Sequence, residues 1–330
     1  MDRTRSAGVV KARRGVFLVS VVLMVAAACQ VPPPPPAPPP SGGGSTPSMV
    51  QNGSLGGCPV LPADNPWNQD VSSLPVAAGS AAYVASIGLG GHLHADFGGG
   101  GVYGIPYVAV RSQPPVPVNF TAYGSESDPG PYPVPLSAPV EGGAGSSGDR
   151  HVLAVDADHC VLYEMYRAFP QQGHWDADSG AVFNLRSNAL RPDGWTSADA
   201  AGLPIFPGLV RYDEVTAGAI RHALRFTVAR TQRGFIHPAT HQASSSSDPS
   251  LPPMGLRLRL KASFDTSTFH GEARVVLDGL KRYGMIVADN GSNWYVTGAA
   301  DARWDDTDLN QLKTVPGSSF EAVDTGPILH

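Results

Sequence analysis

The sequence lacks the features that mark several large classes of protein. Beyond residue 28 it has no cluster of lysine and arginine, which argues against nucleic acid and anionic lipid headgroups as ligands because phosphate contacts need a basic face. No glycine-rich loop is followed by the helix and the Lys-Ser/Thr pair that hold a nucleotide phosphate. No Gly-x-Ser-x-Gly elbow surrounds Ser187 or Ser197, so a hydrolytic triad of either serine with His222 is not favoured.

Long apolar runs are also missing. The run of residues 16–25 is about half of the ~20 residues that a helix needs to cross a bilayer. It follows a basic start and precedes three alanines and Cys29, the pattern of a secretory signal peptide at residues 1–28. A cysteine directly after these alanines is typical of bacterial lipoproteins, in which its thiol receives a diacylglycerol and the cysteine becomes the new N-terminus. Cleavage by an ordinary signal peptidase would instead give a soluble secreted protein.

The pattern therefore predicts an exported chain that Cys29 anchors to the cell membrane or the outer membrane. Cysteine is scarce: the whole chain has three. Lipidation of Cys29 leaves Cys58 and Cys160, and an even remainder in an exported chain favours a disulfide bond between them. Two buried free thiols are the alternative.

Proline and glycine are abundant, and they mark the region that follows the anchor. Residues 29–57 hold two proline runs and then a Gly/Ser-rich piece. Consecutive prolines form a stiff polyproline II rod, and the Gly/Ser piece is a flexible joint. We therefore expect a linker at residues 29–57 and a single globular domain at residues 58–330.

Acidic residues outnumber basic ones. Removal of residues 1–28 takes away five of the 23 basic residues and one of the 28 acidic residues, which leaves a net charge of −9. Such a charge suits a neutral polymer or a basic small molecule. The expected partner is a polysaccharide or a cell-wall glycan, and nucleic acid is not expected.

Short strands separated by turns rich in glycine and proline dominate the rest of the chain. This pattern predicts a mainly β (α+β) fold, an antiparallel β-sandwich or jelly-roll-like single domain with a few peripheral helices. Amphipathic spacing predicts a helix at residues 267–283. A second helix is expected at residues 304–312, because Asp305 and Asp306 would lie near the positive end of its dipole. The clearest turn, residues 156–159, predicts a hairpin. Strands are expected at residues 107–111, 116–121, 151–155, 161–166, 181–185, 222–227, 256–262 and 294–297.

Four segments carry a resemblance to a known group of proteins. The longest, residues 180–216, contains the block SNALRPDGWTSADAAGLPIFPGLVRYDEV, and the others are residues 93–98, 125–134 and 255–266. Together they resemble an uncharacterised family of secreted bacterial proteins and lipoproteins over nearly all of residues 58–324. The resemblance implies export and a single β-rich domain, and it carries no activity.

The passage of residues 191–214 is rich in charged groups beside an aromatic ring. The ring of Trp195 is suited to stack on the face of a pyranose, and the charged groups are suited to bind its hydroxyls. Such a combination predicts a sugar-binding site on a turn-rich segment. The residues expected to hold substrate are Trp195, Arg191, Arg211, Tyr212 and His222.

The same passage supplies carboxylates for catalysis. Two carboxyl groups across a glycosidic bond, one protonated and one ionised, suffice for its hydrolysis. We expect Asp199 and either Asp213 or Glu214 to form this acid/base pair, with Asp96 in reserve. The alternative is purely structural, with Trp195 in the core and either Ser197 or Asp199 at the start of a short helix.

A second motif places His92, His94 and Asp96 at alternate positions, so that in an extended segment all three project from one face. Two imidazoles and a carboxylate can hold a divalent transition metal with open positions for a substrate. The leading prediction is nevertheless a glycoside hydrolase without a cofactor. A non-catalytic glycan-binding or wall-binding lipoprotein and a metal-dependent enzyme built on this motif are the alternatives.

Overall fold

The computed structural model describes residues 46–330, so the signal peptide, Cys29 and the proline runs lie outside the described residues. The described chain belongs to one compact unit, Ser45–His330. Its first strand, β1 (Ser48–Gln51), pairs with β3 (Tyr107–Arg111), and the fold therefore begins before the boundary expected at residue 58. Within this part of the chain, no helix is both long enough and apolar enough to cross a membrane.

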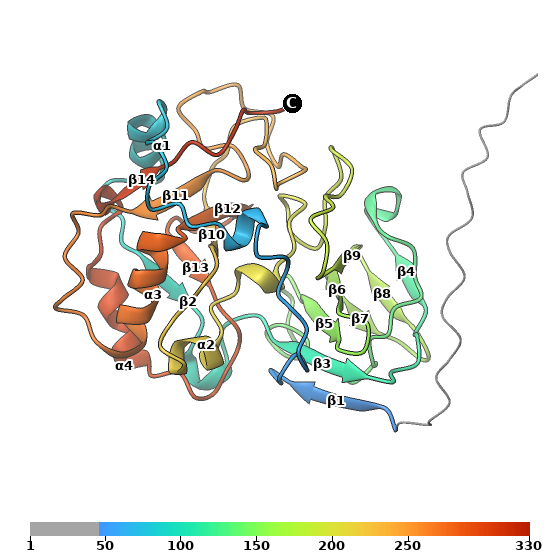
Figure 1. Ribbon diagram of the computed structural model, residues 1–330. Helices are drawn as coiled ribbons and strands as arrows, with labels where there is room; N and C mark the ends of the chain where they lie inside the picture. Colours follow the sequence, from blue (N-terminus) through green and yellow to red (C-terminus); the bar gives the residue numbers. More distant parts are fainter. Residues whose placement is uncertain (1–45) are drawn as a thin grey trace, which may run out of the picture. The chain divides into compact units, whose positions relative to one another are not determined.

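A five-stranded sheet forms one side of the unit (Figure 1). Its spatial order is β1-β3-β5-β6-β9, with β5 (Val152–Asp156), β6 (Val161–Tyr166) and β9 (Ser179–Asn184). The strands β3 and β5 are buried on both faces, because alternate side chains along them enter two different hydrophobic cores. The predicted hairpin between β5 and β6 is confirmed, and the Asp156 carboxylate accepts hydrogen bonds from two backbone N–H groups of its turn.

A six-stranded sheet forms the other side. Its strands, in spatial order, are β14 (Phe320–Ala322), β11 (Arg257–Leu260), β12 (Met285–Asn290), β10 (Leu224–Val228), β13 (Tyr295–Thr297) and β2 (His94–Asp96). The central pair, β10 and β12, is parallel, so the carboxyl ends of both strands meet at one edge of the sheet. This edge faces the region where the candidate site lies.

Helix α3 (Gly271–Arg282) contacts β11 of the six-stranded sheet, within the helix predicted at residues 267–283. Its buried side chains recur at helical spacing, and Lys281 and Arg282 occupy the last turn, where the helix dipole favours positive charge. The helix predicted at residues 304–312 is a short α4 (Asp306–Leu309) that continues as a 3-10 turn. The Asp305 side chain caps it by accepting hydrogen bonds from the backbone N–H groups of Thr307 and Asp308.

The remaining elements are short. A three-stranded sheet has the order β4 (Val118–Phe120), β8 (Trp175–Ala177) and β7 (Phe169–Pro170), and it closes the smaller core, which contains the buried Trp175 and Tyr132. The other helices are α1 (Ser80–Ile87) and α2 (Tyr212–Thr216). The 3-10 turns are η1 (Pro66–Asn68), η2 (Gly99–Gly101), η3 (Gly124–Glu126), η4 (Phe206–Gly208), η5 (Asn310–Thr314) and η6 (Gly317–Ser319).

The mainly β fold with few helices is confirmed, but the antiparallel jelly-roll arrangement is not. Each of the three sheets is mixed, with parallel pairs between β3 and β5, between β10 and β12, between β13 and β2, and between β4 and β8. A parallel pair needs a long crossover between its strands. Here β11 and α3 lie in the connection from β10 to β12, and such a long-range pairing leaves no local turn signal in the sequence.

The predicted disulfide bond joins Cys58 to Cys160, with 5.3 Å between their Cα atoms and a separation of 102 positions in sequence. Cys160 lies in the turn between β5 and β6, so the bond ties the start of the domain to the five-stranded sheet. Because such bonds persist in oxidising compartments, the disulfide indicates an extracytoplasmic location.

Replacing both cysteines with serine is expected to lower the free energy of unfolding by about 2–4 kcal/mol, because the bond restricts the unfolded chain. Denaturant titration of the oxidised wild type and the double variant measures this loss. Wild-type protein treated with a reductant is the control and should lose a similar amount. Equal stability of all three samples would show that the bond adds nothing to folding.

Candidate active site

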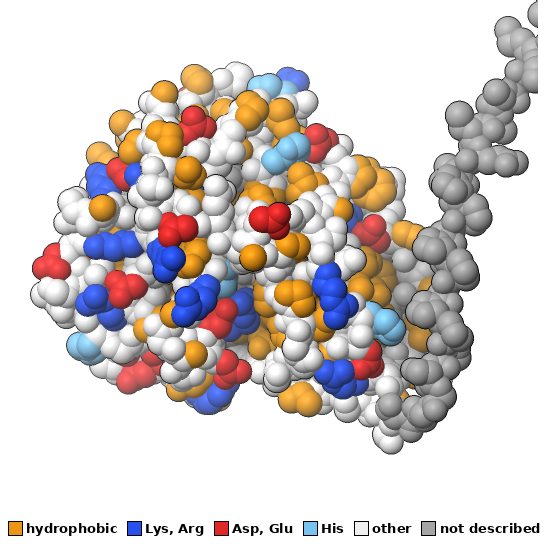
Figure 2. Space-filling view, viewed as in Figure 1, with side chains coloured by type: hydrophobic (Ala, Val, Ile, Leu, Met, Phe, Trp, Pro, Cys, Tyr) orange, Lys and Arg blue, Asp and Glu red, His pale blue; other side chains and the backbone are white. Residues whose placement is uncertain are grey.

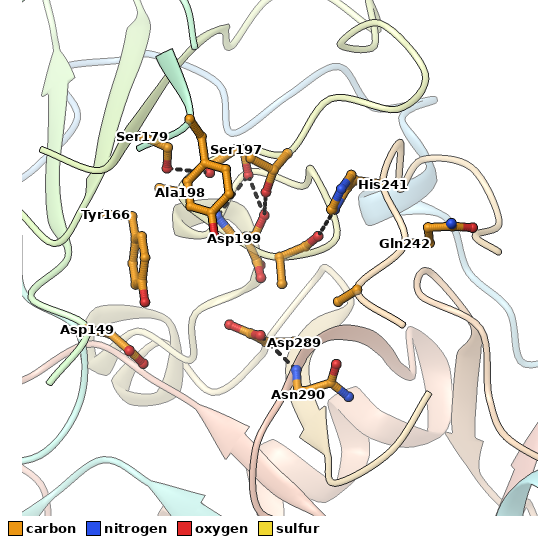
Figure 3. Close-up of a pocket in the computed structure, with 14 residues that line it drawn as sticks. Asp149, Tyr166, Ser179, Ser197, Ala198, Asp199, His241, Gln242, Asp289 and Asn290 are labelled. Carbon is orange, nitrogen blue, oxygen red and sulfur yellow. Dashed lines mark hydrogen bonds between the residues drawn. The ribbon is translucent and has the colours of Figure 1, made fainter. Parts of the chain in front are cut away.

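A cavity of about 490 Å³ lies where the five-stranded and six-stranded sheets approach each other. The end of β6 contributes Tyr166, the start of β9 contributes Ser179, and the carboxyl end of β12 contributes Asp289 and Asn290. Loops supply the rest of the lining: Tyr123, Asp149, Thr196, Ser197, Ala198, Asp199, Ala200, His241, Gln242 and Ala243. In the view of Figure 3, Asp199 and Asp289 lie between Tyr166 on one side and His241 on the other.

One buried cation connects the carboxylates at the base of this cavity. Arg225, from β10, donates from Nε to Asp199 Oδ2 at 2.9 Å and from Nη2 to Asp199 Oδ1 at 3.2 Å. The same Nη2 donates to Asp289 Oδ2 at 3.1 Å, and Nη1 donates to the hydroxyl of Thr297 at 2.8 Å. The guanidinium is therefore held in one orientation by three side chains from three segments of the chain.

The two carboxylates bound to Arg225 differ in their access to solvent. The Asp199 side chain is fully buried, whereas that of Asp289 is 25% exposed. Burial, together with the charge of Asp199, raises the pKa of Asp289 to about 6, although Arg225 acts in the opposite direction. Asp289 is therefore the carboxyl group of this pair that can reach a ligand and carry a proton near neutral pH.

A third carboxylate, Asp149, stands before β5 and is exposed to solvent. It faces the cavity together with Tyr166, whose pKa is raised by burial and then by the charge of Asp149, with a smaller contribution from Asp289. The cavity thus presents two carboxyl groups in contrasting environments, one solvated and one partly buried. Contrasting environments are how a site obtains one ionised and one protonated carboxyl group.

The loop of residues 196–200, here called the wall loop, is held in place by His151. Its Nδ1 lies 2.6 Å from Glu141 Oε2, and its Nε2 lies 3.0 Å from the carbonyl oxygen of Ala198 in the wall loop. Burial opposes the charge on His151, but Glu141 outweighs it and raises the pKa of the imidazole to about 9. Both ring nitrogens face acceptors, so His151 is a charged donor at neutral pH.

Further hydrogen bonds fix the wall loop from both sides. The Ser179 hydroxyl donates to the carbonyl of Ser197 at 2.7 Å, and the Ser197 hydroxyl donates to the carbonyl of Leu203 at 2.6 Å. His241 Nδ1 lies 2.8 Å from the carbonyl of Ala200. A loop held by this many bonds keeps its functional groups in place before a ligand arrives.

The structure places only one of the main predicted site residues, Asp199, on the cavity. Arg191 donates from Nε to the carbonyl of Thr196 at 3.0 Å and from Nη2 to the carbonyl of Glu126 at 2.6 Å. Its guanidinium lies 5.6 Å from the ring of half-buried Trp195, and neither residue lines the cavity. Arg191 therefore holds the wall loop at Thr196, and Trp195 packs against Arg191 outside the cavity.

The other predicted residues form a separate cluster around α2. Glu214 accepts from Arg211 Nη2 at 2.5 Å and lies 3.0 Å from His222 Nε2. Burial alone would raise the pKa of Glu214, but the charges and hydrogen bonds of Arg211 and His222 outweigh it and lower the pKa to about 2. Asp213 pairs with Arg303 at 3.1 Å at the surface. The ring of Tyr212 packs against Trp304 with 5.0 Å between the ring centres.

The expected acid/base pair of Asp199 with Asp213 or Glu214 is thus not brought together at the cavity. The reason lies in the segment between them, residues 201–210, which is buried throughout and passes through the main core. Asp199 and residues 213–214 are therefore close in sequence but lie in different parts of the structure. The α2 cluster serves to hold a helix end, because each of its charges already has a partner.

His92, His94 and Asp96 do not converge on one point. The His94 ring packs against Tyr295, with 4.2 Å between ring centres, and lines a second cavity of about 240 Å³ beside Lys313. Desolvation raises the pKa of Asp96, and the charges that act on it come from Glu141, Arg225 and Asp149. Within residues 46–330 no three His, Cys, Asp or Glu side chains are placed to bind one metal ion.

Sequence reasoning missed Asp149 and Asp289 as site residues. A signal for Asp289 exists, because Asp-Asn directly follows the apolar run Met-Ile-Val-Ala, and ligands commonly bind beyond the carboxyl ends of parallel strands. Asp149 has no comparable signal, since it lies in a loop rich in glycine and serine. Known proteins offer no further guide: no family model, curated protein or solved structure matches the chain.

Proposed function

We propose that the chain is an extracytoplasmic glycoside hydrolase and that the cavity between the two sheets is its active site. The observation that carries this proposal is the presence, in one polar cavity, of the solvated Asp149 and of Asp289 with its raised pKa. A proton donor and an ionised carboxylate are the two groups that hydrolysis of a glycosidic bond requires. The cavity is large enough for a sugar unit and is open to solvent.

In this proposal Asp289 is the general acid, which protonates the oxygen of the leaving sugar. Asp149 is the ionised partner, which either takes a proton from the attacking water or attacks the anomeric carbon itself. The rings of Tyr123 and Tyr166 can pack on pyranose faces, and the amide of Asn290 can bind hydroxyls. Asp199 is too buried to touch substrate. Together with Arg225 it is a positioning residue that orients Asp289.

The substrate class follows from charge. Side chains of both signs are interspersed over the face in Figure 2, and no large basic area is visible on that face. The cavity itself carries three aspartates. A polysaccharide that carries no acidic groups is therefore the substrate that fits.

A direct test is a glycan screen that records both binding and the appearance of reducing ends. We expect one class of polysaccharide to be cleaved, and we expect Asp149→Asn to lower kcat/KM on it by about 10²–10⁴-fold. The matched control is Asp265→Asn, which removes the same charge from an exposed loop outside the cavity and should leave activity unchanged. Binding without any product would instead favour a non-catalytic glycan-binding protein.

We also propose that Cys29 carries the lipid anchor, as the sequence pattern suggests, and that the segment between Cys29 and β1, residues 30–47, holds the domain away from the membrane. Replacing Cys29 with alanine is then expected to move the protein from the detergent phase to the aqueous phase in a phase-partition experiment. Metabolic labelling with a fatty acid should mark the wild type and not the variant. Release of the wild type into the medium without label would contradict the anchor.

A further inference from the structure

Two acidic groups near the cavity lack a positive partner. Asp149 and Asp96 are exposed, and neither takes part in an ion pair among the described residues. In the pairing of β2 with β13, Asp96 lies beside Thr297, the residue whose hydroxyl binds Arg225. Paired residues in neighbouring strands share a face of the sheet, so Asp96 faces the same side as the Arg225 network.

The nearby cations cannot turn toward a ligand to balance these charges. Every nitrogen of the Arg225 guanidinium already donates to Asp199, Asp289 or Thr297. Both nitrogens of His151 are likewise occupied, by Glu141 and by a backbone carbonyl. The hydrogen bonds of Arg225 and His151 are therefore made within the protein, whereas Asp149 and Asp96 are accessible to a ligand.

The balance of charge in and around the cavity is consequently negative. Arg225 offsets one of the two carboxylates that it binds, and His151 offsets Glu141. The second carboxylate bound to Arg225 remains, and so do Asp149 and Asp96. Water in the cavity screens these charges, but between groups partly surrounded by protein the attraction for a cation is still several times stronger than in bulk water.

We infer that the cavity selects a saccharide that carries a protonated amino group, as in a polymer of glucosamine, over its N-acetylated counterpart and over polymers of uronic acid. This inference rests on the proposed function, since it assigns the substrate class of the same site. The amino group would contact Asp149 in the cavity while the glycosidic oxygen meets Asp289, and Asp96, which lies outside the cavity lining, adds to the negative potential around Asp149. A uronic acid would instead face the same carboxylates with a like charge.

Calorimetric titration of the purified protein with three sets of matched oligosaccharides tests this assignment. The ligands are oligomers of glucosamine, N-acetylglucosamine and galacturonic acid, at a pH below the pKa of the sugar amine. The glucosamine oligomer is expected to bind at least about tenfold more tightly than the other two. This preference should shrink as salt is added, because salt screens the attraction.

The variants separate charge selection from catalysis. The double variant Asp96→Asn/Asp149→Asn should lose most of the preference for the amine, whereas Asp265→Asn should keep it. Equal or tighter binding of the N-acetylated or uronic oligomers by the wild type would overturn the inference, as would the absence of binding by all three.

Release of reducing ends is scored separately: amine-selective binding without product from any glycan supports the inference and contradicts the proposed hydrolysis. Cleavage of an N-acetylated polymer without a preference for the amine supports the proposed hydrolysis and overturns the inference of amine selectivity.

Discussion

Replacing Arg225 with methionine is expected to lower the free energy of unfolding by about 3–5 kcal/mol, because it leaves two buried carboxylates without their positive partner. The Asp199 side chain is fully buried and that of Asp289 is only 25% exposed, so water replaces little of the interaction that Arg225 provides. The loss should grow as the pH rises, since protonated carboxyl groups tolerate burial and ionised ones do not. Denaturant titrations at two pH values measure both effects.

Two controls accompany this variant. Arg303→Met removes a cation that pairs with Asp213 and Asp301 while its own side chain is 52% exposed, and it should cost at most about 1 kcal/mol. Adding Asp199→Asn to Arg225→Met removes one of the stranded charges and should restore part of the stability. If Arg225→Met were as stable as Arg303→Met, the network would not be a structural centre of the site.

Replacing Asp289 with asparagine is expected to lower kcat/KM by about 10²–10⁴-fold, the usual contribution of a general acid. In the wild type, activity should fall as the pH rises through about 6, because the pKa of Asp289 lies there and the proton needed by the leaving oxygen is lost above it. The residual activity of the variant should lack this dependence. Rates on the cleaved polysaccharide, measured across pH for both proteins, test the assignment.

Asp213→Asn is the informative comparison for this prediction. It makes the same chemical change at a surface carboxylate that sequence reasoning favours for catalysis and that the structure places in the α2 cluster. We expect it to retain wild-type rates. Loss of activity in Asp213→Asn together with full activity in Asp289→Asn would move the active site from the cavity to α2.

Local patterns predicted local structure well. The strands at residues 107–111 and 161–166 have the observed bounds, and the hairpin turn and α3 lie where periodicity and turn residues indicate. Composition and cysteine count likewise predicted the Cys58–Cys160 bond. The strands, the turn and α3 depend on residues close together in sequence, and the disulfide bond follows from the number of cysteines. The amino-acid sequence contains both kinds of information directly.

The site depends on contacts that no local pattern records. Asp199 was predicted, but its partner Arg225 lies 26 residues further along the chain and Asp289 lies 64 residues beyond that. Strand β12, which carries Asp289, was missed altogether because its short apolar run has no alternation to distinguish it from a buried helix segment. The parallel pairing of β10 with β12 then decides which side chains meet, and only the three-dimensional structure supplies it.

The position of β1 determines how a pulling force would enter the domain. Tension applied at the N-terminal side of Ser48 loads first the hydrogen bonds of an edge strand, whose residues are exposed and which joins the sheet through β3 alone. After β1 has peeled away, the strain reaches Cys58, where a covalent link to the far end of the β5–β6 hairpin halts the unravelling. The residues that line the candidate cavity all follow Cys58 in the chain, so a domain under tension would lose its first strand before the cavity is disturbed.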